Sequence, residues 1–243
     1  MIDTNFDFRT DTPTGKDPDA HSRTLRTYHK LLWSKTLPCG QVFELDDSIR
    51  GHYLLDRSSI GEFSLTSDAI THSYKYVKRM QHIIGALPLD YVESLFSRGC
   101  TIGSYIVFPG KKIGGKMNIN GARGCNAKIG DRFDLTLECI RRHYFGIESP
   151  LAEVLARYGD YFKLFESFQG YVEYFLLQDL VTEDFSAVKF YLPFTEFQTS
   201  PYPASVEDYM IYNEGTIAFI NGRNDRIRQK ASSSDSGLVE PIN

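Results

Sequence analysis

Residues 110–132 combine the side chains and the backbone freedom that binding of an anion requires. The segment holds six basic residues, six glycines and three asparagines against a single acid, Asp131, in a chain of formal charge -4. Glycines let the backbone turn its amides toward an anion, and Lys and Arg supply charge-assisted donors. We therefore expect a site for a phosphate-bearing ligand, a nucleotide or a nucleic-acid end, bound by Lys116, Arg123, Asn126 and Arg132.

The start of this segment also matches part of a phosphate-binding loop. Gly110 to Lys116 follows the pattern G-x-x-x-x-G-K and comes directly after an expected strand. Met117, however, stands where a Ser or Thr hydroxyl would bind Mg²⁺, and the glycines within residues 118–124 argue against the helix that should follow. We therefore favour a glycine-rich loop over a true phosphate-binding loop. An exposed basic loop without a ligand is the ordinary alternative.

The helix expected over residues 131–144 supplies the candidates for catalysis. Its apolar face carries Phe133, Leu137, Ile140 and Tyr144, and its polar face carries Asp131, Asp134, Glu138 and Arg142. Asp131 is expected to cap the helix, so an anion would have to bind the loop rather than the helix terminus.

Three residues of this helix are possible acid/base groups, namely Asp134, Glu138 and His143. Asp134 and Glu138 could also present a divalent metal to a phosphate ester. The simpler interpretation is a surface ion-pair network of Glu138 with the arginines three and four residues later, and a His143 stabilised by the helix dipole. We favour the simpler interpretation and expect no metal site.

No other pattern in the chain is typical of a known catalytic site. There is no H-E-x-x-H and no G-x-S-x-G, and the four cysteines, at positions 39, 100, 125 and 139, lack C-x-x-C spacing. Four scattered cysteines in a chain of this size indicate reduced thiols rather than a disulfide framework. The sequence does not indicate a cofactor.

Composition narrows the class of protein. With 42% hydrophobic and 24% charged residues, a chain of 243 residues can bury one sizeable core. Its acidic balance argues against coating of nucleic acid by bulk electrostatics, and it has neither a long apolar stretch nor a basic, apolar leader. We expect a cytoplasmic protein that does not bind membranes.

Residue periodicity predicts an α+β fold, a mostly helical single domain with a small antiparallel sheet. The first helix should begin with Asp17 as N-cap and Pro18 as its first residue. Further helices are expected over residues 74–84, 89–96, 131–144, 151–181 and 205–230, with breaks at Gly159, Gly170, and Gly215 or Gly222. Strands are expected over residues 41–45, 52–55, 62–65, 102–108 and 188–194.

Both ends of the chain have the composition of flexible segments. We expect a flexible N-terminal segment at residues 1–16, a globular domain at 17–230 and a disordered tail at 231–243. Trimming residues 1–12 should then leave stability intact. The exception is a pair of aromatic residues, Phe6 and Phe8, which alternate like a short edge strand.

One stretch of sequence resembles a known family. The residues from Gly121 to Tyr144, GARGCNAKIGDRFDLTLECIRRHY, are similar to a signature of a family of uncharacterised bacterial proteins of about this length. That resemblance implies a bacterial, cytoplasmic protein and no particular activity.

Two classes of function follow from these features. The first is an enzyme or enzyme-like protein that binds a phosphate-bearing ligand through residues 110–132. The second is a non-catalytic protein whose basic loop binds an acidic protein partner. If Arg123 is a surface cation, its replacement by alanine should barely change the stability of the free protein.

Overall fold

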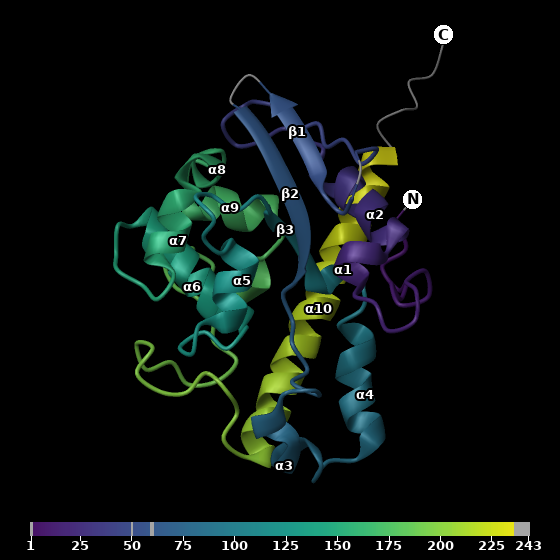
Figure 1. Ribbon diagram of the computed structural model, residues 1–243, viewed down its shortest axis with the longest axis vertical. Coiled ribbons are helices and arrows are strands. Elements are labelled where there is room, and N and C mark those ends of the chain that lie inside the picture. Colours follow the sequence, from purple (N-terminus) through teal and green to yellow (C-terminus); the bar gives the residue numbers. More distant parts are fainter. Residues whose placement is uncertain (1, 50, 59–60, 236–243) are drawn as a thin grey trace.

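A three-stranded antiparallel sheet lies in the middle of the molecule (Figure 1). The computed structural model describes residues 2–49, 51–58 and 61–235. The strands are β1 (Leu54–Ser58), β2 (Gly61–Ala69) and β3 (Tyr105–Pro109), in the order β1-β2-β3. Leu65 of β2 is paired with Leu54 on one side and with Pro109 on the other, which fixes the register.

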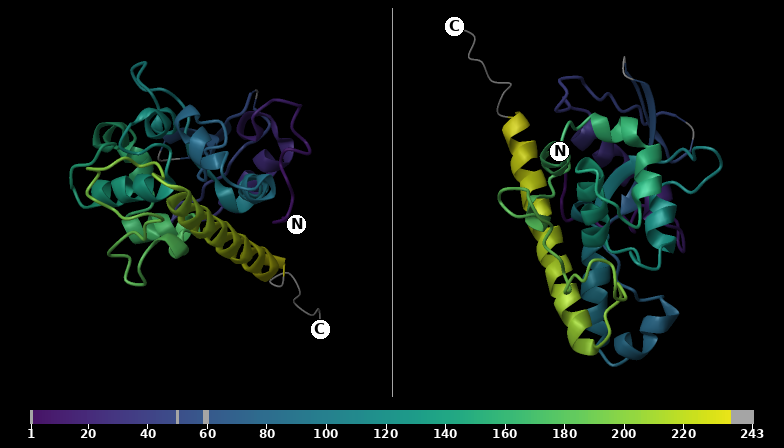
Figure 2. Two further views of the ribbon diagram at one scale, coloured as in Figure 1. Left: turned by 90° about the horizontal axis from the view of Figure 1, so that it is seen from below. Right: turned by 90° about the vertical axis from the view of Figure 1, so that its left-hand side faces the viewer.

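Ten α-helices surround this sheet within the described residues, and the prediction of a mostly helical α+β fold is confirmed. They are α1 (Pro18–His21), α2 (Arg23–Trp33), α3 (Gln81–Ile84), α4 (Leu89–Arg98), α5 (Ile119–Cys125), α6 (Phe133–Tyr144), α7 (Ala152–Arg157), α8 (Gly159–Lys163), α9 (Phe168–Tyr174) and α10 (Val206–Asp235). Figure 1 shows α5 to α9 on one side of the sheet and α1 and α2 on the other. The long helix α10 runs beside α4 and extends along the molecule (Figure 2).

Local signals predicted the first helix correctly. Asp17 is the N-cap of α1 and Pro18 is its first residue. The helical stretch is interrupted at Ser22, whose hydroxyl accepts a hydrogen bond from the amide of Leu25 and so caps α2.

Two of the expected strands are wrong. Residues 41–45 and 188–194 form only isolated bridges, between Thr36 and Val42 and between Val181 and Val188. Their apolar side chains, such as those of Phe43 and Val188, are nevertheless buried. An apolar run bounded by turns therefore indicated burial correctly but not pairing.

The helical segment expected over residues 151–181, with breaks at Gly159 and Gly170, is confirmed only in part. Helix α7 ends at Arg157 and α8 begins at Gly159, but the later breaks lie at other residues. Glu166 and Leu176 adopt left-handed backbone angles, with φ of 61° and 58°, which end a helical path. Gly170 lies inside α9 instead of breaking it. A Cβ at that position would lie 2.1 Å from the carbonyl oxygen of Phe165, so only glycine fits.

Helix α10 continues through both glycines that were expected to interrupt it. A Cβ at Gly215 would meet the ring of Tyr191 at 3.0 Å, and one at Gly222 would meet the carboxylate of Asp179 at 2.9 Å. These glycines therefore allow neighbouring segments to approach the helix closely. The helix extends to Asp235, so residues 231–235 of the expected tail are helical, and residues 236–243 lie outside the described residues.

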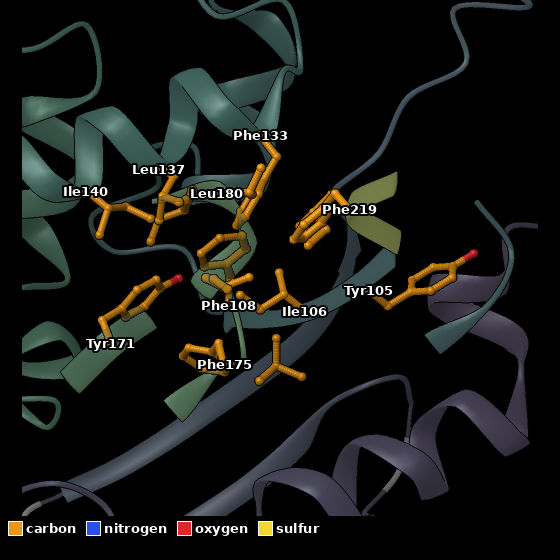
Figure 3. Close-up of a cluster of buried hydrophobic side chains, with 14 of the residues drawn as sticks. Tyr105, Ile106, Phe108, Phe133, Leu137, Ile140, Tyr171, Phe175, Leu180 and Phe219 are labelled. Carbon is orange, nitrogen blue, oxygen red and sulfur yellow. The ribbon is translucent and has the colours of Figure 1, made fainter. Parts of the chain in front are cut away.

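The main hydrophobic core lies between β3 and the helices around it (Figure 3). Its members come from β3, from α6 and α9, from the turn after α9 and from α10: Ile106, Phe108, Phe133, Leu137, Ile140, Tyr171, Phe175, Leu180 and Phe219. The apolar face predicted for α6 thus faces this core. All five residues of β3 are buried, as expected for a strand covered on both faces.

The N-terminal segment differs from its expected flexibility, because Phe8 is part of the core. Its ring is fully buried and lies 5.8 Å from that of Tyr28 and 5.5 Å from that of Tyr105. Its backbone amide donates to the carbonyl of Cys100 at 3.0 Å. One aromatic side chain therefore anchors a segment that is otherwise polar.

None of the helices in the described ranges combines the length and the apolar content needed to cross a membrane.

Candidate functional site

The basic segment folds as an exposed loop followed by a helix, which its glycines did not predict. Residues 111–117 are exposed, and α5 begins directly after them. Asn118 is the N-cap, and its side chain accepts a hydrogen bond from the amide of Gly121 at 3.0 Å. The terminus of this short helix is therefore capped by the chain itself.

Arg123 is buried and ion-paired instead of lying on the surface. Its side chain is 1% exposed, and its Nη1 lies 2.6 Å from the carboxylate of Asp68 and 3.1 Å from that of Asp131. The same guanidinium donates to the carbonyls of Ala69 and Asp131. Burial by itself would lower the pKa of Arg123, but the two carboxylates outweigh it and raise the pKa. Arg123 is thus a structural cation.

Arg132 and Asp134 form a second buried ion pair. Arg132 also donates to the carbonyl of Pro201, and the carboxylate of Asp134 accepts the amide of Tyr191 at 3.0 Å. Asp134 was expected on a solvated face, yet it is fully buried. Arg132, and not Asp131, is the N-cap residue of α6, and it makes no side-chain capping bond.

Glu138 makes the expected ion pairs, but it is buried. Its carboxylate lies 2.8 Å from Arg141 and 2.7 Å from Arg142 at the predicted spacings of three and four residues, while its side chain is only 4% exposed. The polar face of α6 is therefore covered by neighbouring segments.

The remaining predicted residues lie apart from these pairs. The ring of His143 packs 5.1 Å from that of Phe162, and burial lowers the pKa of His143. Lys116 is exposed and forms a 2.8 Å ion pair with Glu153. The side-chain amide of Asn126 donates a hydrogen bond to the carbonyl of Pro150. The residues predicted to bind and to catalyse thus do not converge on one pocket, and anion binding at residues 110–132 stays a prediction.

A large cavity lies elsewhere, between the N-terminal segment, the end of β2 and the end of α4. Its volume is about 860 Å³. We call it the Asp19 cavity, and the charged and histidine residues that line it are Arg9, Lys16, Asp17, Asp19, Asp68, His72, Lys75 and Asp131. Among these residues, only Asp131 belongs to the segment singled out in the sequence.

Three carboxylates of this cavity are held by neighbours from different elements. Asp19 of α1 accepts hydrogen bonds from the hydroxyl of Ser67 at 2.7 Å and from the amide of Ala69 at 3.3 Å. Asp68 and Asp131 are bridged by the same nitrogen of Arg123. The buried arginine therefore positions two carboxylates, and β2 positions the third.

The protonation equilibria of two carboxyls are strongly displaced. Burial, followed by the charges of Asp68 and Asp17, raises the pKa of Asp19 to about 8. Burial also raises the pKa of Asp68 to about 6, because it outweighs the opposing effect of Arg123. Neighbouring carboxyls with separated pKa values are typical of acid/base sites.

His72 borders the same carboxylates as a neutral side chain. Its Nδ1 accepts the amide of Tyr74 at 2.8 Å, so its proton is on Nε2, 3.9 Å from the carboxylate of Asp131. Burial lowers the pKa of His72 although Asp131 opposes that effect.

The backbone around the cavity is strained at two positions. Asp131 has φ of 63° and Tyr74 has φ of 56°, in the left-handed region that bulky side chains rarely adopt. The hydroxyl of Tyr74 donates to the carbonyl of Gly130 at 3.0 Å, which ties the two segments together.

Relative to the wild type, the stability of the Asp19→Asn variant should increase as the pH rises. A carboxyl whose pKa is raised by folding contributes stability below its ordinary pKa of 3.8 and loses that contribution as the pH rises through about 8. The free energy of unfolding of the variant, minus that of the wild type, should therefore increase between pH 5 and pH 8.5 in urea denaturation. For Asp160, which is 86% exposed, the same replacement should give a constant difference. A constant difference for Asp19 as well would contradict the expectation.

Few features of the sequence indicate this cavity. Asp19, Asp68 and Asp131 are far apart in the chain and belong to no known motif. One usable signal was Asp68, an acid near the end of a run with strand-like alternation. Within the described ranges, no group of three or more His, Cys, Asp or Glu side chains is arranged to hold a metal ion.

Comparison with known proteins places the chain in a family. No curated protein and no solved structure matches it. A family model described as "Family of unknown function (DUF6994)" matches residues 2–227, so the match includes the Asp19 cavity and the buried arginines. The resemblance noted at residues 121–144 is thereby confirmed as that of an uncharacterised family. The chain belongs to the family of unknown function DUF6994.

Proposed function

We propose that this protein is an enzyme that performs general acid–base catalysis on a small polar molecule bound in the Asp19 cavity. The observation that carries the proposal is the pair of neighbouring carboxyls, Asp19 and Asp68, whose pKa values are raised to about 8 and about 6 in one cavity. The cavity volume also falls in the range of roughly 300–1,000 Å³ that is common for small-molecule sites.

The different pKa values assign a role to each carboxyl. At pH 7 Asp19 is mostly protonated and can donate a proton, whereas Asp68 is mostly ionised and can accept one. Arg123 holds Asp68 beside Asp131, so the base has a fixed position. Fixed position and separated pKa values are the two properties that proton transfer to a bound substrate requires.

The charges of the lining favour a neutral or cationic ligand. Two of its cations, Arg9 and Lys75, are already paired with Asp7 and Glu93, while the carboxylates of Asp68 and Asp131 share one arginine. An anion near these carboxylates would be repelled. Hydroxyl or amine groups suit carboxyls as partners, so we propose a polyol, a sugar or an amine as the substrate class.

A ligand panel tests this proposal. At about 100 times its dissociation constant, a bound ligand should stabilise the fold by roughly 2.7 kcal/mol, which corresponds to a rise in melting temperature on the order of 5 °C or more. We expect polyols, amino sugars or polyamines to give this rise at pH 7 with the wild type and not with Asp19→Ala, which removes the hydrogen-bonding group.

A matched control shows whether a ligand binds in the Asp19 cavity or at the basic loop. Lys116→Ala, which changes an exposed residue outside the cavity, should leave the rise intact. If only nucleotides or sugar phosphates raise the melting temperature, and Lys116→Ala abolishes the effect while Asp19→Ala does not, the basic loop is the site and the proposal fails.

A further inference from the structure

Behind the Asp19 cavity, a chain of hydrogen bonds leads from the core to Asp19. Its first member is Trp33, whose indole Nε1 lies 3.0 Å from Nδ1 of the fully buried His29. An indole nitrogen is only a donor, so Nδ1 of His29 must be the acceptor and carries no proton.

The protonation state of His29 follows from its surroundings. Burial, followed by the charge of Arg223, lowers the pKa of His29 to about 3, so the imidazole is neutral at ordinary pH. Its one proton is therefore on Nε2, which lies 2.9 Å from the hydroxyl oxygen of Ser67. His29 donates and Ser67 accepts.

The direction of the hydrogen bond between Ser67 and Asp19 follows from that between His29 and Ser67. Because the oxygen of Ser67 accepts from His29, its own proton is directed to Oδ1 of Asp19, at 2.7 Å. This direction excludes Ser67 as a nucleophile activated by His29, since such a serine must donate to an unprotonated histidine nitrogen. It also gives Oδ1 of Asp19 the shorter hydrogen bond, whereas Oδ2 accepts only the longer bond from the amide of Ala69, at 3.3 Å, and is the better placed oxygen to hold a proton.

We propose that His29 and Ser67 are positioning residues of the Asp19 cavity, which keep Oδ1 of Asp19 as an acceptor and so place the carboxylic proton on Oδ2. This inference rests on the proposed function of Asp19 as the acid. Trp33 fixes His29, His29 fixes Ser67, and Ser67 fixes the oxygen that carries the transferable proton.

Other charged and titratable groups also face Asp19 and contribute to its titration. Asp17 precedes it, Asp68 lies on β2 and Tyr105 on β3. Arg26, His29 and His52 line a separate, small cavity that Asp19 also borders. These groups are unchanged by a substitution at Ser67, so a change in the titration of Asp19 would report on the hydroxyl.

The test is the titration of Asp19 in the full-length protein, followed by the ¹³C NMR signal of its carboxyl carbon. The hydroxyl of Ser67 favours the ionised form, so Ser67→Ala should raise the pKa of Asp19 by about one unit. Ser67→Thr keeps the hydroxyl and should restore the wild-type titration. If Ser67→Ala lowers stability equally at every pH and leaves the titration unchanged, Ser67 is only structural and the inference is overturned.

A second measurement keeps the inference testable if the Ser67 variants fold poorly. In wild-type protein, ¹⁵N NMR should find His29 with its proton on Nε2 and no further protonation down to about pH 4. A proton on Nδ1 would contradict the proposed chain of hydrogen bonds from Trp33 to Asp19.

The two proposals fail in different ways. Titration of wild-type Asp19 near its ordinary value of 3.8 would remove the proposed acid and with it the proposed function. If the pKa of Asp19 is raised but does not respond to Ser67→Ala, only the positioning role of His29 and Ser67 is contradicted.

Discussion

Replacing Arg123 by alanine should lower the free energy of unfolding by about 3–5 kcal/mol, the effect of removing one partner of a buried ion pair. The substitution leaves the carboxylates of Asp68 and Asp131 without the guanidinium that bridges them. It also removes the donors to the carbonyls of Ala69 and Asp131. This expectation replaces the near-neutral effect predicted for a surface cation. Urea denaturation at pH 7 measures it.

The pH dependence identifies the cause of that loss. Without Arg123, the pKa of Asp68 should rise above its present value of about 6, because the cation that lowers it is absent. In the folded variant Asp68 is then protonated at pH 5. The loss in free energy of unfolding, relative to the wild type, should therefore be smaller at pH 5 than at pH 8.

Lys116→Ala is the matched control for Arg123→Ala. Both residues are cations of the same segment, but Lys116 is 62% exposed, and its ion pair with Glu153 is exposed as well. Its loss should change the free energy of unfolding by no more than about 0.5 kcal/mol. Equal, small effects of the two substitutions would mean that Arg123 is not held in the buried pair.

Replacing Phe8 by alanine should cost about 3–5 kcal/mol, as for other buried phenylalanines. The side chain is fully buried against the rings of Tyr28 and Tyr105, so its removal leaves a cavity in the core. Deleting residues 1–12 should cost at least as much, because the amide that binds the carbonyl of Cys100 is lost as well. A thermal melt of each variant, together with urea denaturation, measures the loss.

An exposed phenylalanine provides the comparison for Phe8. Phe145 is 59% exposed at the end of α6, and its replacement by alanine should change stability by about 0.5 kcal/mol or less. If Phe8→Ala behaves like Phe145→Ala, or if the truncated protein is as stable as the full chain, the N-terminal segment is not part of the core.

Much of the fold could be predicted because its signals are local. The start of α1 follows from a capping carboxylate next to a proline, since both act within one helical turn. The apolar face of α6 follows from the spacing of Phe133, Leu137 and Ile140, and those side chains are indeed in the core. The breaks around α9 could not be predicted in this way, because they come from left-handed backbone angles at Glu166 and Leu176, two residue types that do not indicate a turn.

The candidate site depends on tertiary structure more than the fold does. Composition alone determined that residues 110–132 concentrate positive charge, but it could not determine which of those charges meet carboxylates. Arg123 is neutralised by Asp68, 55 residues away, and Arg132 by Asp134 within a covered helix. Asp19 becomes a candidate acid only because packing against β2 partly buries it near Asp68 and Asp17. Burial and charge pairing depend on distances between segments remote in sequence, and only tertiary packing sets those distances.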